Sequence, residues 1–185
     1  MTIHTSTSPL LSIDCLLEMS EAIGIHITEL PEGSSGNLYA WCGPDGGILY
    51  IGKSEGDRRV PEQRRWVEKA QDLFTDRTLP AFSTVLIKQN ATQIPLYYDA
   101  EKSDLNQAKS LAKEGQWWGK MHQKMMKYRG SLTVREVERI LIRMPLATGN
   151  ITMNCSGAGI WNNYLNNLED HLAQLAAIEC GHREL

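Results

Sequence analysis

The 185-residue sequence predicts an α/β domain of the α+β type, in which helices flank a small antiparallel sheet of three strands. Residues 37–42 and 48–52 are short apolar segments on either side of GPDGG, a sequence typical of a β-hairpin turn. Residues 82–89 (FSTVLIKQ) are rich in β-branched side chains and predict the third strand. The remaining apolar patterns have helical spacing.

The other elements follow in chain order around this sheet. Residues 31–36 (PEGSSG) form a linker, and Pro61 suits the first turn of a helix through EQRRWVEKAQDLF. We expect an N-terminal helical extension at 1–35, a core at 36–155 containing a helical insertion at 100–130, and a C-terminal helix at 156–185. Helices are predicted at 10–25 (ending near Gly24), from Pro61, at 104–128 (bending at Gly115), at 134–144 and within 161–179.

The N-terminal sequence and the cysteines indicate the cellular compartment of the protein. The N-terminal sequence lacks the basic flank and long apolar stretch of a signal peptide, and no apolar run reaches the length of a membrane span. Cys15, Cys42, Cys155 and Cys180 are scattered without a C-x-x-C pair, which argues against structural zinc and favours reduced thiols. These features predict a cytoplasmic protein.

Charge is distributed unevenly along the chain. The net charge is −3, but 18 of the 19 basic residues lie between Lys53 and Arg143, together with 12 of the 22 acidic ones. A basic middle between acidic ends is compatible with a polyanionic partner such as nucleic acid. Solvated helix faces carrying Lys and Arg explain the same distribution equally well.

One short motif has two interpretations. Gly47, Gly52, Lys53 and Ser54 satisfy G-x-x-x-x-G-K-[ST], the pattern of a phosphate-binding loop. Such a loop needs irregular backbone before a helix, whereas the intervening ILYI has the character of a strand interior and EGDRRVP is a poor helix start. A nucleotide hydrolase is therefore only a distant third hypothesis.

As a hairpin, the same motif pairs two tyrosines. Tyr39 and Tyr50 are expected opposite one another, give or take a bulge, with Ile48, Tyr50 and Gly52 on one face. The sequence G-N-L-Y, followed after eleven residues by Y-I-G-K-S, resembles the GIY-YIG nuclease family over about residues 36–155. The first family motif is degenerate here (Asn37-Leu38-Tyr39), and the second is intact.

The resemblance implies a metal-binding glutamate on a later helix. In the 134–144 helix, Val134, Val137, Leu141 and Met144 mark the apolar face, and Glu138 falls inside that arc. A carboxylate on an apolar face is costly unless it is paired or binds a metal, so Glu138 is the predicted ligand, with a salt bridge to an arginine as the alternative. Thr133 and Glu136 form a capping box instead.

The family also implies a catalytic arginine and asparagine. Arg65 is favoured because it lies in a helical segment before Trp66, with Arg58, Arg59 and Arg64 also near the expected place. A tyrosine or histidine four residues from this arginine, seen in many relatives, is absent. Asn150 follows Glu138 at the family's usual spacing, and Asn154 competes with it.

The resemblance implies hydrolysis of DNA phosphodiesters with one Mg²⁺, or another divalent ion such as Mn²⁺, held by Glu138. Tyr39 or Tyr50 would orient or deprotonate water with help from Lys53, while an arginine clamps the phosphate. Arg64, Lys120 and Lys124 are the predicted nucleic-acid contacts, although the lysine-bearing segment also fits a core helix. A restriction, mobile-element or defence endonuclease is the first hypothesis, and a non-catalytic nucleic-acid-binding relative is the second.

Overall fold

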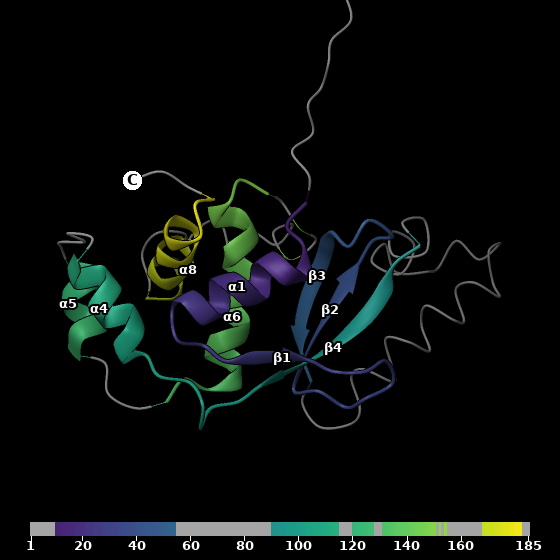
Figure 1. The fold of residues 1–185 in the computed structure, drawn as a ribbon, viewed down its shortest axis with the longest axis horizontal. Helices are drawn as coiled ribbons and strands as arrows, with labels where there is room; N and C mark the ends of the chain where they lie inside the picture. The colour runs from purple at the N-terminus through teal and green to yellow at the C-terminus, as the bar shows by residue number, and fades with distance from the viewer. Residues whose placement is uncertain are drawn as a thin grey trace, which may run out of the picture.

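A computed structural model describes residues 10–54, 90–114, 120–127, 131–150, 152, 154 and 168–182, and everything structural below concerns these residues. They form a mixed α+β fold in which an antiparallel sheet lies beside a group of helices (Figure 1). The strands are β1 (Ile27–Glu29), β2 (Leu38–Cys42), β3 (Ile48–Lys53) and β4 (Thr92–Tyr98). The helices are α1 (Ile13–Ala22), α4 (Asn106–Glu114), α5 (Lys120–Lys127), α6 (Val134–Ala147) and α8 (Leu168–Glu179).

The sheet has four strands in the order β1-β4-β2-β3, so the predicted number of three was wrong. The predicted strand 82–89 lies outside the described residues, and β4 pairs with β2 instead. Pro95 interrupts the strand pattern of β4, because proline cannot donate to a ladder. The Pro95 carbonyl accepts from the Leu30 N–H, one residue beyond the end of β1. In an antiparallel strand the nitrogen and the carbonyl of one residue point to the same side, so the proline nitrogen, which has no hydrogen to donate, also faces the side where β1 has already ended.

The β2–β3 hairpin is confirmed, and a bulge changes its faces. The register shifts between Trp41 and Cys42, so that Trp41 pairs with Tyr50, Cys42 pairs with Ile48, and Leu49 is the extra residue. Ile48 therefore shares the core-facing side with Cys42 rather than the side of Tyr50, contrary to the sequence prediction. Because Ile48–Lys53 is a strand, this motif does not form the irregular loop that phosphate binding requires.

Helices α1 and α6 contact the sheet, α8 packs against these two helices, and α4 and α5 contact α8 and lie farther from the sheet (Figure 1). The predicted helices at 10–25, 134–144 and within 161–179 correspond to α1, α6 and α8, and α6 continues through Pro145 to Ala147. The predicted 104–128 helix contains α4 and α5; residues 115–119 between them, like the predicted helix from Pro61, are outside the described residues. Buried side chains from α1, α6, α8 and one sheet face form most of the core, and Ala108, Ala112 and Met125 add to it from α4 and α5.

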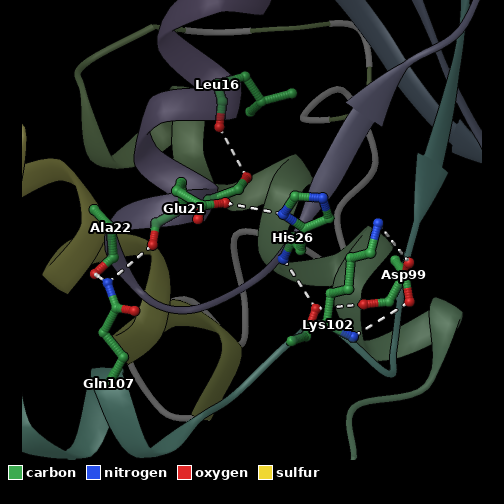
Figure 2. A network of polar contacts seen from close by, with 9 residues as sticks. Leu16, Glu21, Ala22, His26, Asp99, Lys102 and Gln107 are labelled. Carbon is green, nitrogen blue, oxygen red and sulfur yellow. Dashed lines mark hydrogen bonds and ion pairs between the residues drawn. The ribbon is translucent and has the colours of Figure 1, made fainter.

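Polar contacts hold the end of α1 against the chain that follows β4 (Figure 2). His26 contacts Glu21 at 3.3 Å through its Nδ1, and its backbone N–H donates to Ser103 at 2.9 Å. Gln107 donates to the last carbonyls of α1. Gly24 has a φ of 79°, and a Cβ there would overlap the Asp104 carbonyl, so this close crossing requires glycine.

Candidate active site

The two tyrosines of the hairpin lie on the sheet face opposite the helical core. Tyr39 pairs with Gly52, and Tyr50 pairs with Trp41, so the tyrosines are diagonal neighbours rather than direct partners. Their ring centroids are 6.3 Å apart and their planes are tilted by 32°. Tyr39 is only 1% exposed, while Tyr50 is half-buried. Of the two hydroxyl-bearing side chains, Tyr50 is thus the one open to solvent.

Gly52 is needed because of where the Tyr39 ring lies. A Cβ at Gly52 would overlap the hydroxyl oxygen and Cζ of Tyr39, so the ring lies directly across this residue. The glycine of the Tyr50-Ile51-Gly52 motif therefore has a packing function: it lets the Tyr39 phenol approach the β3 backbone.

Glu138 reaches β3 from helix α6. Thr133 caps this helix in the predicted capping box: its hydroxyl accepts from the Glu136 N–H, and Glu136 accepts from the Thr133 N–H at 2.7 Å. Glu136 is thereby committed to the helix end. The Glu138 carboxylate accepts instead from the backbone N–H of Lys53 at 2.9 Å. Across the described ranges Glu138 makes no ion pair, so the alternative of an arginine partner finds no support there.

The asparagine nearest β3 is Asn154. Its amide accepts from the Ile51 N–H at 2.8 Å and donates to the Ile51 carbonyl at 2.7 Å, as a neighbouring strand would. Asn150 lies at the end of α6, where its side chain donates to Thr148 and its backbone N–H to the Pro145 carbonyl. Of the two asparagines left open by the sequence, the structure brings Asn154 to β3 and leaves Asn150 at the helix terminus.

Lys53 is half-buried at the end of β3 and pairs with Leu38. Because side chains alternate along a strand, Lys53 leaves β3 on the core-facing side, opposite Tyr39 and Tyr50. Its side chain therefore starts on the sheet face from which α6 approaches, rather than on the face of the two phenols.

The remaining predicted residues either lie outside the described part of the chain or belong to α5. Arg58, Arg64 and Arg65, together with Arg59, lie outside the described residues. Lys120 and Lys124 belong to α5, which Figure 1 places away from the sheet. Any nucleic-acid contact by α5 would thus be separate from the groups around β3.

The carboxylate at β3 fits a largely hydrated divalent ion such as Mg²⁺. The described ranges contain no cluster of three or more histidine, cysteine, aspartate or glutamate side chains that could hold a metal ion. Glu138 can supply a single ligand beyond its bond to Lys53. Mg²⁺ is commonly held by one or two carboxylates, with water and phosphate oxygens completing the octahedron, so this residue fits that ion and does not fit an all-protein site.

Sequence reasoning missed the function of Asn37, which stands where the family motif is degenerate. Its side chain donates to the Tyr98 carbonyl at 3.0 Å and accepts from the Tyr98 N–H at 2.7 Å. This pair continues the β2–β4 ladder past the start of β2. The asparagine amide can pair with backbone in this way because it carries both a donor and an acceptor, but this capacity alone does not reveal in the sequence which backbone it meets.

No protein-family model, curated protein or solved structure matches this chain. The longest of the described helices, α6, has 14 residues, and none among them has the length and apolarity of a membrane span.

Proposed function

We propose that the protein is a metal-dependent endonuclease that hydrolyses DNA phosphodiester bonds at the outer strand β3. The supporting observation is that four groups converge on residues 50–53: Tyr50 itself, the Tyr39 ring over Gly52, the Asn154 amide at Ile51, and the Glu138 carboxylate at Lys53. These come from β2, α6 and the chain after α6, so separate parts of the sequence meet at one short segment.

Each group has a chemical role in this proposal. Glu138 would hold Mg²⁺, which when bound neutralises phosphate charge and polarises the bond to be broken. Tyr50, being the more exposed tyrosine, would orient the attacking water and, as its phenolate, accept the proton that the water loses. Lys53 would add positive charge near the phosphate that is bound at Glu138. Asn154 would keep β3 in place through its bonds to Ile51. One of the arginines among Arg58, Arg59, Arg64 and Arg65 would clamp the phosphate.

The direct test compares two glutamates on the same helix. Purified protein is incubated with supercoiled plasmid and Mg²⁺, and nicked and linear products are measured. Glu138→Gln keeps the acceptor for the Lys53 N–H but removes the charge, so cleavage should collapse while DNA binding persists. Glu136→Gln should cost only about 1 kcal/mol of stability through the weakened cap and leave cleavage intact. Equal activity of the two folded variants would contradict the assignment of Glu138.

Binding by the basic residues has its own test. About six phosphate contacts would give a slope near −5 in a plot of log K against log salt concentration for duplex DNA. Charge reversal at Lys120 and Lys124 should reduce that slope if α5 follows the backbone. Lys102→Glu, a substitution in the turn before α4, is the control. An unchanged slope in the α5 variant would mean that α5 does not contact DNA and is a helix of the protein core. DNA binding without cleavage by the wild type would favour the non-catalytic alternative.

A further inference from the structure

Helix α6 is held on its far side by an ion pair inside the protein. Arg143 on α6 and Asp170 on α8 approach to 2.6 Å between Nε and Oδ1, and their side chains are 8% and 0% exposed. The contact is an ion pair whose geometry falls short of a hydrogen bond. The Arg143 Nη1 also donates to the Arg139 carbonyl at 2.9 Å, which fixes the guanidinium along the helix.

The other buried residues of α8 are leucine and alanine, except for His171. Contacts between such apolar side chains do not depend on pairing one particular group with another. A buried charge pair behaves differently, since any shift that separates the two ions removes the opposite charge from beside each of them in the protein interior. The pair therefore selects one placement of α6 on α8.

That placement bears on Glu138 through the geometry of the helix. Arg143 follows Glu138 by five residues, which is about 140° around the helix axis. Helix α6 packs against both β3 and α8: Glu138 contacts β3, and Arg143 contacts α8. A rotation of α6 that separated Arg143 from Asp170 would also move the Glu138 carboxylate relative to the Lys53 N–H.

We infer that the Arg143–Asp170 pair positions Glu138 at β3, making α8 part of the site rather than an appended helix. Both are positioning residues, since neither touches β3. The consequence for catalysis rests on the proposed function, whereas the placement of Glu138 can be measured without it.

The experiment uses the full chain with Arg143→Met and Asp170→Leu combined, which removes both charges and keeps the interface apolar and filled. Hydrogen exchange is followed at the Lys53 amide, which Glu138 protects, and at the Ile51 amide, which Asn154 protects on the same strand. We expect Lys53 exchange to accelerate at least about tenfold more than Ile51 exchange, because the loss is local. The Mg²⁺ concentration for half-maximal cleavage should rise severalfold.

A neighbouring pair provides the matched control. Arg139 and Glu169 join the same two helices at 3.7 Å, but the Arg139 side chain is 46% exposed. Arg139→Gln with Glu169→Gln should leave Lys53 exchange and the Mg²⁺ dependence unchanged. If the apolar double variant does not fold, Arg143→Lys retains the charge at a shorter reach and should raise Lys53 exchange to a smaller degree.

The outcomes separate the two proposals. Equal changes at Lys53 and Ile51, or none, together with wild-type Mg²⁺ dependence, would overturn the positioning inference and leave the nuclease assignment standing. Absence of cleavage by the wild type would overturn the nuclease assignment, and the exchange comparison would still decide whether the pair positions Glu138.

Discussion

The phenol of Tyr39 lies across Gly52, its partner in the β2–β3 register, so closely that the glycine has no room for a side chain. Two residues that belong to different motifs in the sequence thus form a single packing unit. The place of the Tyr39 ring therefore depends on a glycine at position 52.

Gly52→Ala should therefore destabilise the protein by about 1–3 kcal/mol, the usual cost of overpacking. Urea unfolding measures this cost. Tyr39→Leu removes the Cζ and hydroxyl atoms that the new methyl group would meet, so the alanine substitution should cost less in that background. Strictly additive effects of the two substitutions would mean that the ring does not occupy the space over Gly52.

Removing single hydroxyl groups should distinguish the two tyrosines. Tyr50→Phe is expected to slow plasmid cleavage at least about a hundredfold if this hydroxyl handles the proton of the attacking water. Tyr39→Phe should have a smaller effect, because Tyr39 is 1% exposed and water does not reach it readily. Single-turnover rates, measured where both variants are folded, make the comparison. A greater loss in Tyr39→Phe would reverse the proposed roles.

The two asparagines should differ in the same way. Asn154→Ala removes both hydrogen bonds to Ile51, with an expected loss of about 1–3 kcal/mol in the free energy of unfolding and reduced cleavage. Asn150→Ala removes one bond to Thr148 at the end of α6 and should leave cleavage near the wild-type rate. Unfolding curves and plasmid assays on both proteins test this; a cleavage defect confined to Asn150→Ala would move the site toward the helix terminus.

Cys42 should make stability fall at high pH. Burial, with smaller contributions from the charges of Glu29 and Asp45, raises the pKa of the Cys42 thiol from 9.0 to about 12. The unfolded chain then loses this proton between about pH 9 and pH 12 while the folded protein keeps it, so the stability present below pH 9 declines by up to about 1.4 kcal/mol per pH unit.

Cys42→Ala isolates this contribution. Burial also raises the pKa values of Tyr98 and Cys180, which act in the same direction in both proteins. The difference in slope between wild type and variant in urea unfolding, followed across the alkaline range, therefore reports Cys42 alone. Parallel curves would mean that the thiol is more accessible to solvent than its position in β2 implies.

Local patterns predicted those elements whose signals lie within a few residues. The hairpin follows from its turn, α6 from its apolar spacing, and the Thr133–Glu136 cap from its four-residue motif. The strand β4 was missed because Pro95 argues against an inner strand, and only the early end of β1 makes that proline acceptable. The short strand β1 has no pattern of its own and depends on pairing with β4.

The candidate site was predictable only in part for a similar reason. The helical wheel indicated that Glu138 faces inward, but its contact with the Lys53 N–H depends on how α6 packs against β3. The spacing from Glu138 favoured Asn150 over Asn154. Spacing does not reveal which asparagine reaches Ile51, because that depends on the path of the chain after α6. The bulge at Leu49, which reassigns Ile48 to the core, arises from the hairpin register and has no signature in the residues themselves.

The two side chains that meet β3 also bear on solubility. A strand at the margin of a sheet offers its outward N–H and C=O groups to strands of other molecules, which is a common route to aggregation. Asn154 occupies both groups of Ile51, and Glu138 occupies the N–H of Lys53 with a carboxylate that repels incoming carbonyl oxygens. The residues proposed for chemistry thus also shield this margin against intermolecular strand addition, so a variant lacking both should self-associate before it unfolds.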